Sequence, residues 1–138
     1  MQSKRRSRRF RAKRLAVALV AVASLSGIPA VTSPAHASVH TTCTISRCPD
    51  AVSANSIWSA KGYPTSRGWY NWPNGQCSFA GGQYQNREME LPLGDLYYEY
   101  DVYPRSCGAA RDAYRIVVDF DSGSVWFTPN HYTDFYQL

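Results

Sequence analysis

The sequence predicts an α+β fold, in which one N-terminal helix packs on an antiparallel β-sheet. Two observations lead to this prediction. Residues 49–61 have the spacing of an amphipathic helix, and after residue 82 the apolar residues recur with a period of two. The length suits a single domain over residues 38–138, with the helix and a Trp-rich loop in 38–82 and the sheet in 83–138.

Residues 1–37 have the three parts of a secretion signal peptide. Eight Lys or Arg fall within residues 1–14, a short apolar run covers 15–28, and Ala35-His36-Ala37 forms an A-x-A cleavage site. The apolar run is too short to span a membrane, so we expect a secreted, extracellular protein without a membrane anchor. Ser7-Arg8-Arg9-Phe10 loosely matches a twin-arginine signal, and this route stays open beside the general secretory one.

The charge of the chain changes when the signal is removed. The full sequence has 15 basic and 10 acidic residues and a net charge of +5. Eight of the basic residues lie in the signal, so seven remain against all ten acids and the net charge becomes −3. A general nucleic-acid-binding surface is therefore not expected, and a polyanion must be met by a local cluster of arginines.

Four cysteines lie after the signal and predict two disulfides in an oxidising compartment: Cys43, Cys48, Cys77 and Cys107. A zinc site is disfavoured because their spacings contain no C-x-x-C pair, and we expect no metal or other cofactor. Three pairings are possible, of which we favour Cys43 with Cys48 and Cys77 with Cys107.

The predicted helix begins at Pro49, with Asp50 in its positive first turn, and ends before Gly62 and Pro64. We interpret one apolar side of it as core: Ala51, Ala54, Ile57 and Trp58.

Residues 63–82 are rich in Gly, Pro, Asn and aromatics and are predicted to form a loop, with a turn at Pro73-Asn74-Gly75. We interpret its aromatics as a cover for the edge of the core, with an exposed binding platform as the alternative: Trp69, Tyr70 and Trp72.

The predicted strands are 96–103, 113–119, 124–128 and 131–137, with a tight turn at residues 121–123. Side chains alternate between the two faces of a strand. In the first strand the core face would carry Leu96, Tyr98, Tyr100 and Val102. The opposite face would carry Tyr97, Glu99, Asp101 and Tyr103.

Four side chains could converge on that opposite face and carry chemistry: Glu99, Arg111, Arg115 and His131. A glutamate on a rigid strand is well held for catalysis, and the two arginines are four residues apart and can reach the same side. Pattern alone favours simpler roles for them, namely a solvated glutamate, surface arginines paired with Asp112 or Asp119, and a surface histidine.

Five sequence elements occur in a characteristic order: Tyr84-Gln85-Asn86-Arg87-Glu88 with Leu91-Pro92, Tyr98-Glu99-Tyr100, Arg111, Arg115-Ile116 and His131-Tyr132. This order resembles the microbial guanyl-specific ribonucleases, the barnase group, and especially its streptomycete-type secreted members. The likeness covers residues 84–138, and the Trp-rich loop before it looks like an insertion.

The resemblance implies a metal-independent enzyme that cleaves single-stranded RNA 3′ to guanosine. Glu99 would be the general base at the ribose 2′-hydroxyl and His131 the general acid at the departing 5′-oxygen, giving a 2′,3′-cyclic phosphate that water then opens. Arg111 and Arg115 would stabilise charge on the phosphoryl oxygens. A barstar-like intracellular inhibitor is the protein partner that the resemblance suggests, and we expect a monomer.

The resemblance also implies a base-reading segment: Tyr84, Gln85, Asn86, Arg87 and Glu88. Its backbone N–H groups would meet guanine O6 and N7, and Glu88 would accept from N1–H and the exocyclic amine. Tyr84 and Tyr100 would form aromatic walls, and Tyr132 would contact phosphate.

Three residues depart from the family pattern. Met89 stands where a glycine or small residue is usual, which leaves a relaxed base preference as an alternative. Asn130 replaces an expected aspartate before His131, and Tyr114 replaces a charged residue. A non-catalytic alternative is a disulfide-stapled module that binds sugars through its Trp-rich loop.

Overall fold

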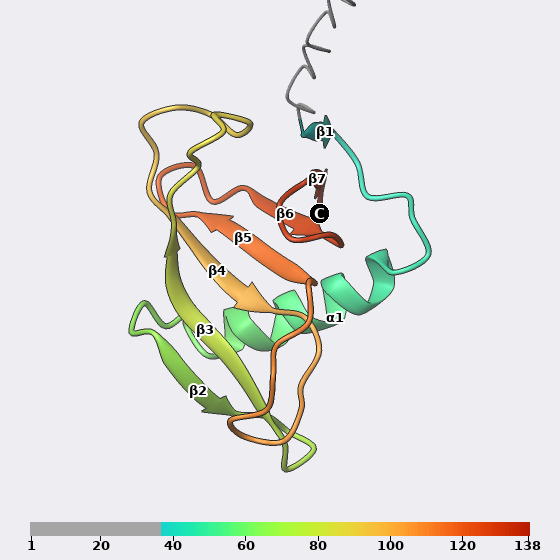
Figure 1. The fold of residues 1–138 in the computed structure, drawn as a ribbon, viewed down its shortest axis with the longest axis vertical. Coiled ribbons are helices and arrows are strands. Elements are labelled where there is room, and N and C mark those ends of the chain that lie inside the picture. Colours follow the sequence, from blue (N-terminus) through green and yellow to red (C-terminus); the bar gives the residue numbers. More distant parts are fainter. Residues whose placement is uncertain (1–36) are drawn as a thin grey trace, which may run out of the picture. The chain divides into compact units, whose positions relative to one another are not determined.

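The computed structural model describes residues 37–138, so the predicted signal peptide lies outside this range except for Ala37. The described part contains one helix and seven strands (Figure 1). In chain order these are β1 (Ser38–His40), α1 (Cys48–Ala60), β2 (Gly68–Asn71), β3 (Cys77–Tyr84), β4 (Tyr97–Asp101), β5 (Arg115–Asp119), β6 (Val125–Thr128) and β7 (Asp134–Gln137). The predicted α+β fold is confirmed. No helix in residues 37–138 is long and apolar enough to cross a membrane.

All seven strands belong to one sheet, in the order β1-β7-β6-β5-β4-β3-β2. Every neighbouring pair is antiparallel except β1 and β7, which are parallel. Strands β4 and β5 therefore lie in the middle of the sheet, where both edges of each strand are hydrogen-bonded. This central position holds the side chains of β4 and β5 in fixed places.

Helix α1 packs on one face of the sheet, as the apolar stripe predicted. Ala51, Ala54 and Trp58 are buried in a cluster with sheet residues that include Tyr100 and Ile116. The indole N–H of Trp58 donates to the backbone oxygen of Asp101 over 2.8 Å. The helix thereby fixes the end of β4, which carries the polar groups described below.

The opposite face of the sheet is more apolar than the alternation suggested. A second buried cluster covers part of it: Tyr84, Leu91, Tyr97, Val117, Trp126 and Phe135. Asp101 and Arg115 are also buried on this side, so the simple picture of a solvated second face is wrong. The polar residues of this face instead lie beside an apolar wall.

The prediction of a loop over residues 63–82 is wrong for half of its length. Residues 68–71 form β2 and residues 77–84 form β3, joined by a tight connection at the predicted turn. The Gly, Pro and Asn content had suggested a loop, but Gly81 and Gly82 lie at a β-bulge in β3. Gly81 has φ +81°, and a Cβ there would lie 2.3 Å from the backbone oxygen of Ser66, so only glycine fits.

The aromatics of this region divide between the two faces. Trp72 and Tyr70 pack against the α1 cluster, as the core interpretation predicted, and Trp69 points to the other face beside Phe79.

Both disulfides form in the favoured pairing. Cys43 is bonded to Cys48 and Cys77 to Cys107. The second bond and a bridge between Cys77 and Arg105 tie the start of β3 to the loop after β4.

Candidate active site

Glu99 lies near the centre of the sheet, where β4 pairs with β3 on one side and with β5 on the other. Its Cα partners are Gly82 and Val117. Gly82 has no side chain, and a Cβ there would lie 3.0 Å from Glu99 Oε1. The glycine therefore leaves the space that the carboxylate occupies. Glu99 opens into a pocket of about 280 Å³, whose other lining residues are Gln83, Tyr84, Gln85, Asn86, Arg87, Glu88 and Tyr132.

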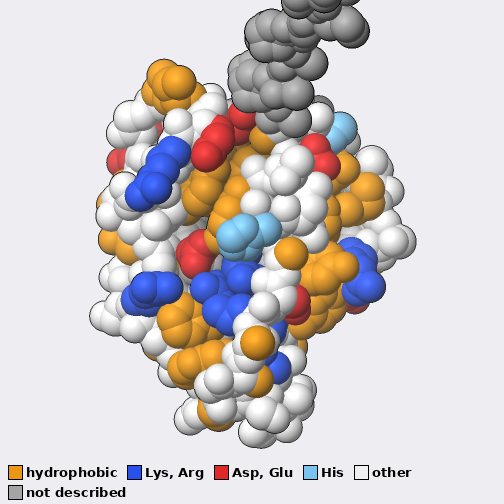
Figure 2. Space-filling view, in the orientation of Figure 1, with side chains coloured by type: hydrophobic (Ala, Val, Ile, Leu, Met, Phe, Trp, Pro, Cys, Tyr) orange, Lys and Arg blue, Asp and Glu red, His pale blue; other side chains and the backbone are white. Residues whose placement is uncertain are grey.

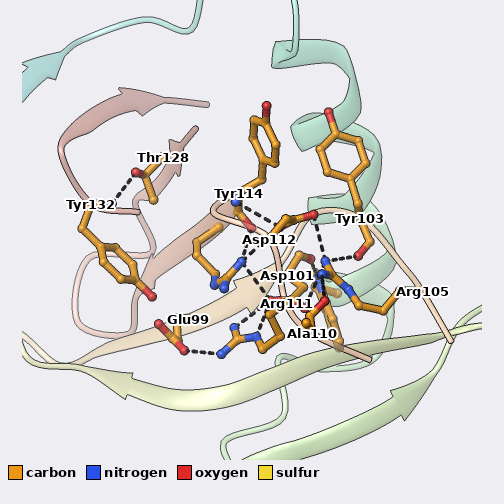
Figure 3. A network of polar contacts seen from close by, with 12 residues as sticks. Glu99, Asp101, Tyr103, Arg105, Ala110, Arg111, Asp112, Tyr114, Thr128 and Tyr132 are labelled. Carbon is orange, nitrogen blue, oxygen red and sulfur yellow. Dashed lines mark hydrogen bonds and ion pairs between the residues drawn. The ribbon is translucent and has the colours of Figure 1, made fainter. Parts of the chain in front are cut away.

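Arg111 connects Glu99 to the fully buried Asp101. Its Nη1 lies 3.1 Å from Glu99 Oε1, while Nε and Nη2 both donate to Asp101 Oδ1, over 2.9 and 2.6 Å (Figure 3). Burial acts to lower the pKa of Arg111, but its hydrogen bonds and charge interactions with Asp101 and Glu99 outweigh this and raise the pKa. The guanidinium is thus a cation held in place beside Glu99.

Two further arginines surround Asp101. Arg115 Nη1 lies 3.3 Å from Oδ1, and Arg105 Nη2 lies 3.5 Å from Oδ2. Both also contact Asp112, at 3.2 and 2.9 Å respectively. Burial lowers the pKa of Arg115, an effect that the charge of Asp101 opposes.

Three arginines and three carboxylates make this polar network formally neutral. Figure 3 shows how its members are linked on one side of the sheet, with Tyr132 reaching toward Glu99. An arriving phosphate would therefore meet guanidinium groups that are already oriented and partly shared with carboxylates.

His131 lies outside β7, so the predicted strand 131–137 is three residues too long at its start. His131 and Tyr132 both have left-handed backbone, with φ +55° and +72°. Hydrogen bonds hold this bend at several points, from His131 N to Ala113 O and from Tyr132 N to Thr128 Oγ1. The imidazole is exposed and lies against the Tyr132 ring, with 4.6 Å between centroids.

The His131 bend is closed by its own polar side chains. Asn130 Nδ2 donates to Asp134 Oδ2 over 2.7 Å, and Asp134 N donates to Asn130 Oδ1 over 2.9 Å. Asn130, which departs from the family pattern, thus has a clear structural task here. A neighbouring pocket of about 450 Å³ contains His131 and is also lined by Ala37, Glu88, Glu90, Tyr132 and Thr133. Ala37 N donates to Glu90 Oε1 in this pocket, over 3.0 Å.

The predicted base-reading segment forms a loop that Asn86 closes. The Asn86 side chain donates to Leu91 O over 2.8 Å and accepts from Leu91 N over 3.1 Å. Its side chain is therefore occupied, which leaves the backbone and Glu88 as the recognition groups of the loop. Met89 is 67 % exposed and has φ +58°, a left-handed backbone conformation that favours glycine over residues with a side chain.

Tyr84 and Tyr132 form an aromatic wall of the pocket. Their rings stack with centroids 4.8 Å apart, and Tyr84 is the more buried of the two. Burial, with the charges of Glu88 and Glu90, raises the pKa of Tyr84 to about 12. A base entering the pocket would therefore meet Tyr132 before Tyr84.

The prediction that Tyr100 forms a second wall is wrong. Tyr100 is fully buried in the α1 cluster, on the face of the sheet opposite Glu99. Its ring packs against Trp58 and Tyr63 and is out of reach of any ligand in the pocket.

The structure brings most of the predicted site residues into adjacent places. Glu99 and the base-reading segment line one pocket, and Arg111 contacts Glu99 at 3.1 Å. His131 lines the next pocket, with Glu88 and Tyr132 common to both. The sequence analysis did not identify Asp101 as the central carboxylate of the network, or Arg105 as one of its partners. The alternation of β4 places Asp101 on the Glu99 face, and this was the available signal.

The α+β fold is consistent with the class of protein that the sequence resembles, a microbial ribonuclease. A family model described as ribonuclease matches residues 32–138. No curated protein sequence matches the chain. Because the family match covers most of the chain, the protein belongs to the microbial guanyl-specific ribonuclease family, and its activity is that of an RNA-cleaving endoribonuclease. The non-catalytic sugar-binding alternative is thereby set aside.

Proposed function

We propose that the protein is a secreted, metal-independent endoribonuclease that cleaves single-stranded RNA 3′ to guanosine. The observation that supports this best is the position of Glu99. Its carboxylate lines the same pocket as the base-reading segment and contacts Arg111 at 3.1 Å. A base pocket, a proton acceptor and a cation for the phosphate are therefore adjacent to one another.

In the first step, Glu99 accepts the proton of the ribose 2′-hydroxyl while the 2′-oxygen attacks phosphorus. The bond from phosphorus to the 5′-oxygen breaks, and His131 gives that oxygen a proton. In the second step His131 takes a proton from water, whose oxygen opens the 2′,3′-cyclic phosphate, and Glu99 returns a proton to the 2′-oxygen. Neither of these two steps requires a metal ion.

Arg111 is the group that links proton transfer to phosphate binding. Asp101 engages its Nε and Nη2, so Nη1 is the atom that a phosphoryl oxygen would share with Glu99. Phosphate bound there competes with Glu99 for the guanidinium and leaves the carboxylate oxygen available to the 2′-hydroxyl. Arg115, held 3.3 Å from Asp101, supplies additional positive charge behind it.

Guanine selection is assigned to Glu88 and to the backbone of the loop that Asn86 closes. A carboxylate accepts both N1–H and the exocyclic amine of guanine, and adenine does not offer this pair of donors. Relaxed base preference remains the second candidate because Met89 occupies a left-handed position of this same loop, where the family pattern predicts a glycine or small residue. The signal peptide and the two disulfides support secretion.

The test uses the purified, oxidised protein and the dinucleotides GpU, ApU, CpU and UpU in the presence of EDTA. We expect a 2′,3′-cyclic product from GpU at the highest rate, and a loss of about 10²-fold or more in Glu99→Ala and His131→Ala. Full activity in both variants would overturn the mechanism. Equal rates on all four dinucleotides would overturn guanine preference and leave the endoribonuclease mechanism intact.

Glu88→Gln tests base reading separately from chemistry. It should lower kcat/KM for GpU far more than for ApU. The substitution replaces one carboxylate oxygen, an acceptor, with an NH₂ group, a donor, and guanine is the base that needs both acceptors. An equal loss on both substrates would contradict the assignment of Glu88.

A further inference from the structure

The signal cleavage predicted after Ala37 would make Ser38 the first residue of the mature protein. Hydrolysis of the Ala37–Ser38 peptide bond by a signal peptidase consumes one water molecule. Ala37 gains the oxygen of water and leaves as a carboxylate with the signal, while Ser38 N becomes an amine that is protonated near neutral pH. Cleavage therefore replaces a neutral amide with a cation at the position of Ser38 N.

Ser38 is held in place by contacts that do not involve the residues before it. Strand β1 lies beside β7 and pairs in parallel with residues 134–136 (Figure 1). The His40 ring stacks on the Tyr136 ring, with 4.4 Å between centroids and 8° between planes. The Cys43–Cys48 disulfide then ties the following segment to the start of α1. The new terminus is therefore presented at the start of β7.

Ser38 N lies close to two hydrogen-bond acceptors. Thr133 O is 3.2 Å away and Asp134 Oδ1 is 3.4 Å away. In the uncleaved chain this nitrogen carries a single hydrogen, which the two acceptors must share. An α-ammonium group carries three hydrogens and can donate to both acceptors. Its charge also strengthens the bond to the Asp134 carboxylate.

Both acceptors belong to the bend that carries His131. Asp134 is joined to Asn130 by two hydrogen bonds, and Thr133 Oγ1 donates to Asn130 O over 3.2 Å. The left-handed backbone of His131 and Tyr132 is unfavourable for residues with a side chain and persists only where surrounding contacts hold it. A cation bound to Asp134 reinforces one of these contacts.

The pocket beside His131 is rich in carboxylates. Glu88 and Glu90 line it, and Asp134 lies next to Ser38 at its edge. Figure 2 shows acidic side chains at the upper end of the face whose centre carries a histidine. In the uncleaved chain Ala37 N donates to Glu90 Oε1, and this donor leaves with the signal. The ammonium group thus adds a positive charge where carboxylates would otherwise repel an RNA phosphate.

We propose that the α-ammonium group of Ser38 is a positioning group for His131, which pairs with Asp134 and holds the His131 bend, so that removal of the signal raises activity. The proposal rests on the proposed function, because it takes His131 as the general acid. The uncleaved precursor is then the less active form. The ion pair is exposed, so its effect on rate is modest, about twofold to fivefold.

The test compares the protein of residues 38–138 with a free Ser38 amine and the same protein acetylated at that amine. Acetylation restores a neutral amide and imitates the uncleaved chain with the fewest added atoms. Lys61 is the one lysine after residue 37, so the parent protein carries Lys61→Arg and has no other amine to acetylate. We expect acetylation to lower kcat on GpU about twofold to fivefold and to leave KM within about twofold, because it acts on the general acid and not on base reading.

Two variants of the parent protein show whether the ammonium group acts through Asp134. In Asp134→Asn the free and acetylated forms should have the same kcat, because the carboxylate partner is gone. Glu90→Gln is the matched control, since it removes a carboxylate from the same pocket but not from the bend, and acetylation should still lower its kcat. Equal kcat for the two forms of the parent protein would overturn the proposal. So would a loss that persists in Asp134→Asn, or one that depends on Glu90.

The dependence on pH separates the charge of the terminus from its shape. The ratio of kcat between the free and acetylated forms should be about two to five at pH of about 6.5 and approach one above about pH 9.5, because a neutral amine cannot pair with Asp134. The other ionisable groups that face the pocket, Glu88, Glu90 and His131, are present in both forms. A ratio that is the same at both pH values would overturn the proposal.

Thermal unfolding separates this proposal from the proposed function, because it does not depend on RNA cleavage. Acetylation should lower the Tm of the parent protein by about 1–5 °C at neutral pH and that of Asp134→Asn by less than about 1 °C. If the protein cleaves no RNA but the Tm values follow this pattern, the contact between Ser38 and Asp134 stands and the catalytic assignment falls. If the enzyme is active but acetylation changes neither Tm nor kcat, the contact falls and the catalytic assignment stands.

Discussion

Asp101→Asn should reduce the stability of the protein more than any other single change to the polar network. Asp101 is fully buried, and its carboxylate contacts Arg105, Arg111 and Arg115 at 2.6 to 3.5 Å. The asparagine side chain has nearly the same shape but no charge, so three guanidinium groups would lose the carboxylate at their centre. Removing one partner from a buried ion pair costs about 3–5 kcal/mol.

That loss is a large part of the 5–15 kcal/mol by which a domain of this size is usually stable. In a domain of about 100 residues it corresponds to a fall in Tm of more than about 12 °C. Urea-induced unfolding followed by tryptophan fluorescence measures the loss directly. Trp58 is a suitable probe because its indole N–H donates to the Asp101 backbone and its ring is fully buried.

Asp112→Asn is the matched control. Asp112 contacts two of the same arginines, Arg105 and Arg115, but its side chain is 32 % exposed. Water can replace its charge, so we expect a loss of about 1 kcal/mol or less. If Asp101→Asn loses no more stability than Asp112→Asn, the view that Asp101 is the organising charge of the site is refuted.

Three further predictions concern the pocket. Gly82→Ala would place a Cβ 3.0 Å from Glu99 Oε1, so kcat should fall severalfold while the urea midpoint changes little; an unchanged kcat would contradict the proposed fit between these residues. Met89→Gly should raise the free energy of unfolding by about 1 kcal/mol in urea unfolding, because residue 89 has φ +58°, and an unchanged stability would show that this backbone carries no strain. The raised pKa of Tyr84, about 12, means that the unfolded chain releases this proton first as the pH rises above 10. The contribution of the neutral Tyr84 phenol to stability is complete below pH 10 and is lost as the pH rises toward 12. Tyr84→Phe should therefore lose less free energy of unfolding between pH 10 and pH 12 than the unmodified protein. If stability falls equally with pH in the two proteins, the raised pKa of Tyr84 is contradicted.

The sequence was informative wherever a simple period governs the structure. The spacing of Ala51, Ala54 and Trp58 predicted both α1 and its buried side, and alternation predicted the face of Glu99. Alternation also placed Tyr100 on the core face. The later assignment of Tyr100 as a pocket wall came from the resemblance alone, and the structure agrees with the period.

Other features depend on contacts that no local pattern contains. Gly81 and Gly82 look like a loop, yet one makes a bulge against Ser66 and the other makes room for Glu99. The burial of Asp101 depends on three arginines, of which two come from the loop between β4 and β5 and one from β5 itself. Alternation gave the face of Asp101 but could not give its partners, because these are set by the tertiary fold.

The contact between Ala37 and Glu90 has a practical consequence for the preparation of this enzyme. Ala37 lines the pocket that contains His131, and Ser38 begins the strand that pairs with β7. We predict that the signal peptide is cleaved after Ala37. Any residue left in front of Ser38, whether from incomplete cleavage or from an affinity tag, would extend the chain from this pocket. Leu138 lines a different pocket, beside the Cys43–Cys48 disulfide. Kinetic comparisons between preparations should therefore use protein that begins at Ser38, with any purification tag at the C-terminus.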